Sequence, residues 1–132
     1  MKNCPLCRVI EDEVQVHRLF ETDEMLAFLS LNPVNPGHCL LVPKVHFNSF
    51  TSMDTGLQGR LFNKAVEISQ HLQRICKGDA FNIHIGNGDA AGQGLLHSHI
   101  HLIPRAHDDG FFWNWRMLDL TEAENDGIAK KF

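Results

Sequence analysis

The pattern of apolar and polar positions predicts one long helix in the middle of the chain. Apolar residues recur every three or four positions from Leu57 to Ile75, which is typical of a helix with one buried stripe. Asp54 can cap the start of this helix, and Gly78 can end it in the left-handed conformation. The pattern therefore predicts a helix between Asp54 and Gly78.

Short apolar runs on both sides of this helix predict strands. Before it, residues 14–19 alternate in polarity and fray into residues 21–23, and compact apolar runs cover residues 25–29 and 39–42. After it, further strands are expected at 81–85 and 96–103, and a short helical turn is expected from Cys4 through Ile10. Strands, then a helix, then strands favour an α+β fold with an antiparallel sheet, because alternating βαβ units are absent.

Composition limits the classes of partner. The chain has 132 residues, of which 43% are hydrophobic, and a net charge of −4, which fits one folded domain over residues 1–132. The acidic balance argues against nucleic acid as a partner. No apolar run approaches the roughly 18–20 residues of a membrane helix, and the start has no apolar signal core. We therefore expect a soluble, cytoplasmic protein with neither nucleic acid nor membrane as its partner.

Histidine is the unusual component of this sequence. Of its nine histidines, five lie between His84 and His107. Residues 97, 99 and 101 are all histidine, and on a strand they would share one face at about 6–7 Å spacing. Imidazole changes protonation near neutral pH, so this segment is the candidate site. A solvated strand face and a metal site built by the same rings are the alternatives.

A glycine-rich segment, Gly86–Gly94, leads into these histidines. Successive backbone N–H groups in such a loop can bind phosphate, although a flexible hairpin connection would have the same composition. Phosphate donors beside imidazoles suggest phosphoryl transfer, in which one histidine attacks phosphorus and water or another acceptor resolves the phosphohistidine. The other imidazoles would then bind oxygens and handle protons.

The segment His97–Ile103 resembles the histidine-triad (HIT) pattern His-φ-His-φ-His-φ-φ, with Ser98 as an imperfect φ. The similarity runs in the family's order from about residue 4 to residue 105, through Cys4–Cys7, Leu26–Phe28, Asn32–His38, Val42–His46, Ala91–Gln93 and Pro104–Arg105. It implies a HIT-like α+β core over about residues 4–105, with residues 106–132 variable. It also implies a five-stranded antiparallel sheet, one long and one short helix, and a homodimer that extends the sheet.

The resemblance further implies a nucleotide-binding hydrolase or nucleotidyl transferase that acts on nucleotides or their conjugates at the α-phosphate. His99 would be the nucleophile, His101 would contact the phosphate and the leaving group, and His38 would support them. His97 would orient the triad or bind metal, and no catalytic cofactor is implied. The implied substrate-binding residues are Ser30, Leu31, Asn87, Gly92, Gln93, Gly94, His99 and His101.

Three positions depart from the family pattern. Ser30 stands where the family has a ribose-binding acid or amide, and one hydroxyl binds a ribose diol less well than a carboxylate does. Gly94 replaces a hydroxyl-bearing residue that could protonate a leaving amine, and Gly86 replaces the first amide of the loop. These changes weaken the case for adenosine phosphoramidate as the substrate but leave phosphohistidine chemistry intact.

Cys4 and Cys7 form a C-x2-C pair, which is a common zinc half-site. A redox role would need a thioredoxin-like context that is missing, and unliganded thiols are the remaining alternative. Cys39 and Cys76 lie in apolar runs, which favours the core for both. His46 and His97 match zinc-ligating positions of cysteine-bearing family members. The expected site is therefore a structural Cys2His2 zinc with no open position.

Other interpretations stay open at this point. The chain could be a non-catalytic, zinc-stabilised dimer that binds nucleotides or a protein, or the triad could itself hold a catalytic metal. His84 is interpreted as a packed or surface histidine. The aromatic segment Phe111–Trp115 is either a lid or dimer element, or a patch that closes the core.

Overall fold

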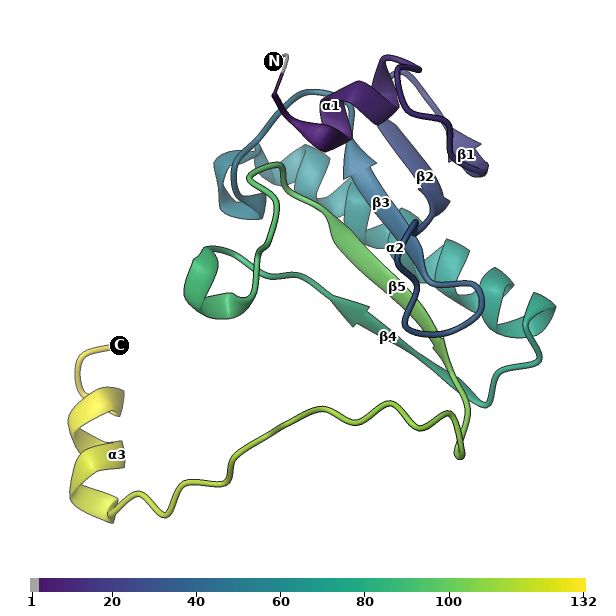
Figure 1. The fold of residues 1–132 in the computed structure, drawn as a ribbon. Coiled ribbons are helices and arrows are strands. Elements are labelled where there is room, and N and C mark those ends of the chain that lie inside the picture. Colours follow the sequence, from purple (N-terminus) through teal and green to yellow (C-terminus); the bar gives the residue numbers. More distant parts are fainter. Residues whose placement is uncertain (1–2) are drawn as a thin grey trace.

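Five strands form one antiparallel sheet in the order β1-β2-β3-β5-β4 (Figure 1). The computed structural model describes residues 3–132. The strands are β1 Arg18–Glu21, β2 Met25–Leu29, β3 Cys39–Pro43, β4 Ala80–His84 and β5 Ile100–Arg105. The helices are α1 Pro5–Ile10, α2 Thr55–Ile75 and α3 Glu122–Ala129, with 3-10 turns at Phe50–Ser52 and Asp89–Ala91. The predicted α+β class and antiparallel sheet are confirmed.

The two faces of the sheet bury two separate apolar clusters. The long helix α2 covers one face (Figure 1), where Leu61 packs with Leu41 and Ile100. On the other face α1 packs against the cluster that contains Phe28 and Leu40. Because neighbouring side chains alternate between faces along a strand, His101, the histidine of β5, lies on the face of the sheet that α1 covers. The apolar core thus leaves the candidate site on the face opposite α2.

The ends of α2 agree with the predicted boundaries in position but not in detail. The Asp54 side chain accepts a hydrogen bond from the Leu57 backbone N–H at 2.9 Å, as a cap should. At the other end Lys77, with φ +53°, takes the left-handed conformation that was predicted for Gly78. Glycine is needed there for another reason, because a Cβ at position 78 would lie 3.1 Å from the carbonyl oxygen of Arg105.

Two strand boundaries were predicted wrongly. The first strand begins at Arg18 instead of residue 14, because Val14 and Val16 pack against the cluster under α1 rather than pairing in the sheet. The last strand begins at Ile100 instead of residue 96. The chain before it follows another segment, since the Ser98 backbone N–H donates to the carbonyl oxygen of Phe47 at 2.6 Å.

Residues 106–132 leave the sheet as an extended segment and end in α3, which stands apart from the body (Figure 1). Thr121 and Glu124 form a reciprocal capping box that defines the start of α3. The division of the chain near residue 105 stays a prediction. Over the part of the chain that the structure describes, no helix has the length and apolarity to span a bilayer.

Candidate active site and metal cluster

The histidines of residues 97–101 separate into two groups instead of forming one row. His97 lies in a bend before β5 and is fully buried, with its ring directed toward the N-terminal cysteines. His99 and His101 remain neighbours, with ring centroids 4.9 Å apart. The prediction of three imidazoles on one strand face is therefore wrong for His97, because regular pairing starts only at Ile100.

His97 joins Cys4, Cys7 and His46 in a compact cluster of metal-type ligands. One donor atom from each residue lies within 4.8 Å of all the others. The Nδ1 atom of His97 is 3.5 Å from the Cys4 sulfur, and Nδ1 of His46 is 3.3 Å from the Cys7 sulfur. Ligands of a tetrahedral zinc are separated by about 3.3–3.8 Å, so these four residues fit a zinc ion.

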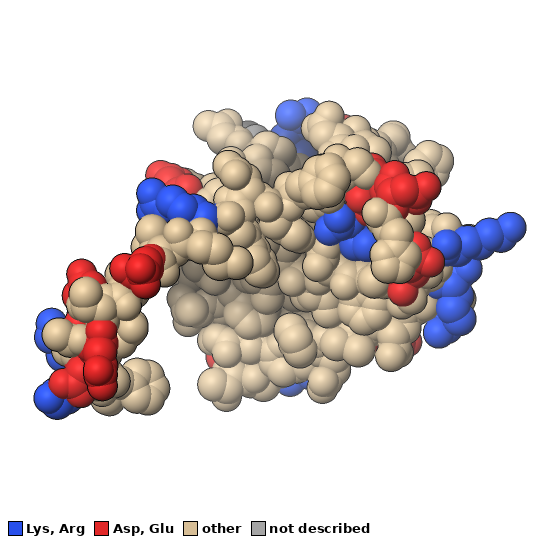
Figure 2. Space-filling view, turned by 90° about the horizontal axis from the view of Figure 1, so that it is seen from below, with Lys and Arg blue, Asp and Glu red and all other residues tan. Residues whose placement is uncertain are grey.

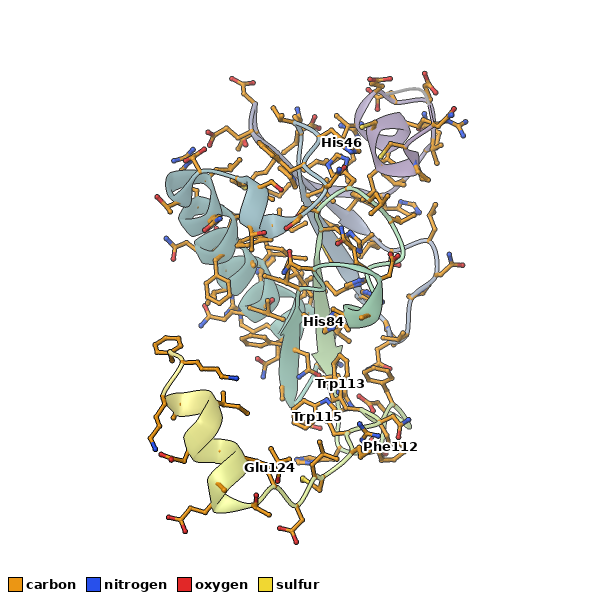
Figure 3. All side chains as sticks on the ribbon, turned by 90° about the vertical axis from the view of Figure 1, so that its left-hand side faces the viewer. His46, His84, Phe112, Trp113, Trp115 and Glu124 are labelled. Carbon is orange, nitrogen blue, oxygen red and sulfur yellow. The ribbon has the colours of Figure 1, made fainter. Side chains whose placement is uncertain are left out.

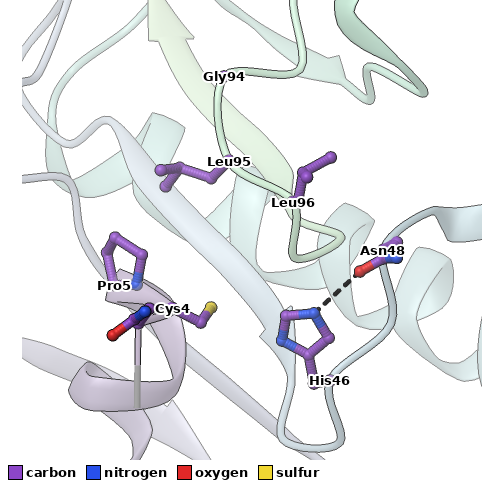
Figure 4. Close-up of a pocket in the computed structure, with 8 residues that line it drawn as sticks. Cys4, Pro5, His46, Asn48, Gly94, Leu95 and Leu96 are labelled. Atoms are coloured by element: carbon purple, nitrogen blue, oxygen red, sulfur yellow. Dashed lines mark hydrogen bonds between the residues drawn. The ribbon is translucent and has the colours of Figure 1, made fainter. Parts of the chain in front are cut away.

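The surroundings of the cluster also suit a cation. The ring nitrogens turned away from the sulfurs are both engaged: Nε2 of His97 donates to the Pro43 carbonyl at 2.9 Å, and Nε2 of His46 lies 3.0 Å from Asn48 Oδ1 (Figure 4). Such outer contacts orient Nδ1 toward a metal. Burial and the adjacent Cys4 raise the pKa of the Cys7 thiol, and a bound cation would offset this by favouring thiolates.

His99 has one ring nitrogen fixed and the other available. Its Nδ1–H donates to the carbonyl oxygen of His97 at 2.7 Å, because a carbonyl can only accept. A neutral imidazole with its proton on Nδ1 carries a lone pair on Nε2. Among the described residues that Nε2 atom has no hydrogen-bond partner. The side chain is therefore buried, oriented and free to act at one atom.

A relay of hydrogen bonds fixes His38 and His101. The backbone N–H of Val34 donates to Nδ1 of His38 at 3.1 Å, so the proton of His38 lies on Nε2. That Nε2–H donates to Nδ1 of His101 at 2.9 Å, which leaves His101 with an outward Nε2–H. Burial lowers the pKa of His38, and burial together with the three neighbouring imidazoles lowers the pKa of His101 to about 4. His101 is thus a neutral hydrogen-bond donor at pH 7.

Gln93 acts as a brace of the glycine-rich loop. Its Oε1 accepts from the Gly88 backbone N–H at 2.8 Å, and its Nε2 donates to the carbonyl oxygens of Asn48 and Leu95. Both amide hydrogens are engaged within the chain, and the expected contact of Gln93 with phosphate stays a prediction. The family-like Ala-Gly-Gln motif shapes the loop.

Among the other loop residues expected to bind substrate, one anchors the loop to a neighbouring segment and two are exposed to solvent. Asn87 Oδ1 accepts from the Phe50 backbone N–H at 2.9 Å, so this side chain ties the loop to the segment before α2. Gly92 and Gly94 are exposed with open space around them, and Gly92 has φ +78°. Gly86 is required by a close approach, since a Cβ there would lie 2.9 Å from the Ala91 carbonyl oxygen.

A partly enclosed pocket of about 290 Å³ lies between α1 and the strands β2 and β3. Its lining is mostly apolar: Pro5, Leu6, Arg8, Val9, Val14, Phe28, Ser30, Leu31, Asn32, Leu40 and Leu95. Ser30 and Leu31 belong to this lining, and their contact with a nucleoside stays a prediction. Neither Met25 nor Leu26 lines this pocket: Leu26 is in the same apolar cluster as Phe28 and Leu40, whereas Met25 is in the cluster under α2.

The start of the C-terminal segment is fastened beside the histidines, a feature that sequence reasoning missed. The Arg105 guanidinium donates to Asp109 at 2.7 Å and to Asn82 Oδ1 at 2.6 Å. The Trp113 indole N–H shares the same Asn82 oxygen at 3.3 Å, and its ring stacks on His84 (Figure 3). Trp113 is thus an anchored side chain, and His84 is packed against it, which is one of the two interpretations given for His84. The one signal available was the antiparallel pairing expected on either side of the loop.

Comparison with known proteins decides the family. The HIT domain matches residues 11–108. The chain belongs to the HIT family. This HIT protein is 38% identical over 113 residues to an uncharacterized HIT-like protein of Borreliella burgdorferi, covering 84% of this chain and 81% of that protein.

Two relatives of this HIT protein carry names that state an activity. The adenylylsulfatase HINT3 of Arabidopsis thaliana is 35% identical over 81% of this chain and 54% of its own length. The adenosine 5'-monophosphoramidase HNT1 of Saccharomyces cerevisiae is 31% identical over 96% of this chain and 77% of its own length.

Solved structures share the fold of this HIT protein. The SMU.412c protein of Streptococcus mutans superposes with a TM-score of 0.91 at 28% identity, covering 99% of this chain and 83% of that one. A zinc-bound histidine triad family protein of Mycobacterium smegmatis gives a TM-score of 0.70 at 26% identity, covering 89% and 85%. The expected HIT-like fold is thereby confirmed.

Proposed function

We propose that this chain is a nucleotidyl hydrolase or transferase that acts at the α-phosphate of a nucleotide conjugate through a covalent intermediate on His99. One observation carries the proposal: His99 has a free lone pair on Nε2, its neighbour His101 has a free N–H on Nε2, and the two ring centroids are 4.9 Å apart. A nucleophile next to a donor for a phosphate oxygen is the minimum equipment for phosphoryl transfer.

The reaction has two steps. In the first, the Nε2 lone pair of His99 forms a bond to phosphorus, and the bond from phosphorus to the leaving group breaks with its electron pair. In the second, water or another acceptor attacks phosphorus, and the pair of the P–N bond returns to Nε2. The products of hydrolysis are a nucleoside monophosphate and the free leaving group.

The contacts of the two imidazoles match these charges. When Nε2 of His99 is bonded to phosphorus the ring becomes cationic, and the His97 carbonyl on its Nδ1–H stabilises that charge. His101 donates its Nε2–H to a non-bridging oxygen, and its neutrality avoids competition for protons at pH 7. His38 acts through His101 as a positioning residue. General acid–base catalysis by a positioned side chain typically increases the rate by about 10²–10⁴-fold.

The apolar pocket beside β2 and β3 supports a nucleoside as the constant part of the substrate. Its lining includes the buried residues Phe28 and Leu40 and the half-buried Ser30. A base and ribose seated there would place the α-phosphate toward β5, because Leu40 pairs directly with His101 across β3 and β5. A single hydroxyl at position 30 predicts weak selection for the ribose diol.

The test is the variant His99→Asn, assayed with a nucleoside phosphoramidate, an adenylyl sulfate and a dinucleoside polyphosphate. We expect the wild type to turn over at least one of them, and the variant to lose at least about 10³-fold in kcat. The matched control is His71→Gln, an exposed histidine on α2, which should keep wild-type rates. Mass spectrometry of quenched wild type should detect a nucleotidyl adduct on His99.

A second candidate function is a non-catalytic nucleotide-binding dimer. It is favoured by the engaged side chain of Gln93 and by Gly94, which offers no hydroxyl to a leaving group. Tight binding of nucleoside monophosphates without turnover of any conjugate would support it. Wild-type activity in His99→Asn would reject the assignment of the nucleophile.

We further propose that the cysteine–histidine cluster holds a structural zinc. Two thiolates and two imidazoles complete a tetrahedral shell with no position for substrate, so the ion would stabilise the fold without entering the reaction. It would fasten α1, through Cys4 and Cys7, to the segment before β5. The zinc-bound relative supports this choice of metal.

We also propose a homodimer. The strand β4 is at the edge of the sheet, and such edges favour pairing with another chain. The C-terminal segment exposes Phe112, Trp115 and Met117 to solvent in the single chain, and Figure 2 shows it projecting beside a broad surface without charged residues. Sedimentation equilibrium should give twice the 15.0 kDa chain mass; a monomer at micromolar concentration would contradict the proposal. The cytoplasmic location stays a prediction.

A further inference from the structure

Four side chains lie in register across the sheet. Phe28 of β2 pairs with Leu40 of β3, Leu40 pairs with His101 of β5, and His101 pairs with His84 of β4. Directly paired residues project from the same face of a sheet, so these four form one row, called here the cross-sheet row. It runs from the apolar pocket, past the phosphate-binding imidazole, to the edge of the sheet.

The row gives the substrate a direction. Phe28 and Leu40 belong to the apolar pocket, and His101 is next to the proposed nucleophile. A nucleotide with its nucleoside over β2 and β3 and its α-phosphate over β5 directs its third part toward β4. Neighbouring strands are about 4.8 Å apart, so His84 lies one strand beyond the phosphorus, where the leaving group departs.

The His84 ring is held at this place and keeps its nitrogens free. Its centroid is 5.6 Å from that of His101 and 5.4 Å from the Trp113 ring, with 26° between the stacked planes. The side chain is half-buried, and over residues 3–132 neither ring nitrogen has a hydrogen-bond partner.

The position of the Trp113 side chain is fixed by hydrogen bonds. Asn82, two residues before His84 on β4, accepts hydrogen bonds from the Trp113 indole and from Arg105. Arg105 continues the connection to Asp109 and to the Phe111 carbonyl. The indole therefore acts as a positioning group for His84, whereas Trp115 in the same segment is exposed.

We propose that His84 is the proton donor to the leaving group, an inference that rests on the proposed function of the site. His84 supplies the group that Gly94 cannot. In the first step the P–X bond breaks, X takes the proton of the His84 imidazolium, and His84 becomes neutral. In the second step water attacks phosphorus, its proton passes to His84, and the electron pair of the P–N bond returns to His99. Each group ends as it began.

The groups around His84 are consistent with this division of labour. His101 faces it from β5, and His38 lies behind His101 on the loop before β3. His38 is buried and His101 is half-buried, and both are already committed to the relay from Val34. Trp113 covers the other side and carries no titratable group. Among the described residues, His84 is thus the imidazole of the cross-sheet row whose nitrogens the relay leaves uncommitted.

The test compares two leaving groups on one nucleoside. Phenyl and 4-nitrophenyl esters of a nucleoside 5'-monophosphate have the same reacting phosphorus, but nitrophenolate departs without a proton and phenolate needs one. In His84→Gln we expect kcat for the phenyl ester to fall about 100-fold and kcat for the nitrophenyl ester to stay within about tenfold. The retained nitrophenyl activity also shows that the variant is folded.

Two further variants separate proton donation from structure. Trp113→Ala should give the same leaving-group dependence with a smaller loss, and Trp113→Phe should recover it because the ring stack remains. Trp115→Phe is the matched control and should behave as wild type. If His84→Gln fails to fold, as judged by circular dichroism, the ratio of the two ester rates in Trp113→Ala decides in its place.

Equal losses on the two esters, or no loss on either, would overturn the role of His84 while leaving His99 as the nucleophile. Failure of the wild type to cleave any nucleotide conjugate would instead reject the proposed function, and this inference with it. The two failures are therefore distinguished by the wild-type measurement alone.

Discussion

The Nε2 atom of His38 lies 2.9 Å from the Nδ1 atom of His101. Because the Val34 backbone already occupies the other nitrogen of His38, this contact assigns the tautomers of both rings. The backbone N–H of Val34, acting through His38, thus determines which nitrogen of His101 carries the proton that can be donated to a ligand.

The first prediction concerns that relay. In His38→Ala the His101 ring loses its only partner among the described residues and can adopt either tautomer. We expect kcat to fall about 100-fold with little change in KM, because the nucleoside pocket is untouched. His38→Gln, which keeps an N–H donor, should recover part of the rate. A change in KM alone would contradict the positioning role.

The second prediction is a loss of stability in mild acid. The pKa of His101 falls to about 4 in the folded chain, from 6.5 when it is unfolded. Between these values the unfolded chain binds a proton that the folded chain does not, so the free energy of unfolding decreases as pH falls from about 6.5 to about 4. Urea unfolding at several pH values should show this decrease.

The variant His101→Asn is the control for this pH effect. It removes one of the imidazoles whose pKa is lowered, so the stability of this variant should vary less with pH than that of the wild type. His38 contributes in the same direction, and some dependence should therefore remain. An unchanged slope in His101→Asn would show that His101 is not the group responsible.

The third prediction concerns metal content. Elemental analysis of purified protein should find about one zinc per chain, and Cys4→Ser should lose most of it together with thermal stability. Cys76→Ser is the matched control, since Cys76 lies outside the cluster near Gly37. A wild type free of zinc, or a Cys4→Ser variant that keeps its full content, would remove the metal site.

The fourth prediction uses the two tryptophans of the chain. In Trp115→Phe only Trp113 fluoresces. The Arg105 guanidinium holds the pKa of the Asp109 carboxyl far below its usual range. The ion pair between Arg105 and Asp109 should therefore persist at pH values well below the pKa of an ordinary carboxyl group. Adding Asp109→Asn should release the segment and shift the Trp113 emission to longer wavelength.

The neighbouring acid provides the control for this measurement. Asp108 is exposed, so Asp108→Asn in the same background should leave the emission unchanged. Equal shifts in the two variants would show that charge, and not the brace, controls the environment of Trp113.

Local patterns sufficed where neighbouring residues decide the structure. The Asp54 cap and the apolar stripe of α2 depend on contacts within a few residues, and both were predicted. The cluster of Cys4, Cys7, His46 and His97 came from the family resemblance, since no spacing rule joins residues 93 positions apart. Position within a strand was harder, because β5 begins where Ser98 stops contacting Phe47.

The features that were missed depend on pairing between distant segments. The partnership of His84 with His101 follows from the exact register of β4 and β5, which a one-residue slip would abolish. The brace around Asp109 requires Arg105, Asn82 and a segment beyond the sheet to meet. The engaged amide of Gln93 likewise depends on Asn48, 45 residues earlier. None of these contacts leaves a periodic trace in the sequence.

His97 participates in both halves of this molecule. Its ring completes the cluster with Cys4, Cys7 and His46, while its carbonyl oxygen holds the Nδ1–H of His99. A cation bound by that ring would therefore also orient the attacking Nε2 atom of His99, although the cation does not contact the substrate. Depletion of zinc, or oxidation of the Cys4 and Cys7 thiols, would then lower the activity of His99 without any change at the substrate-binding residues.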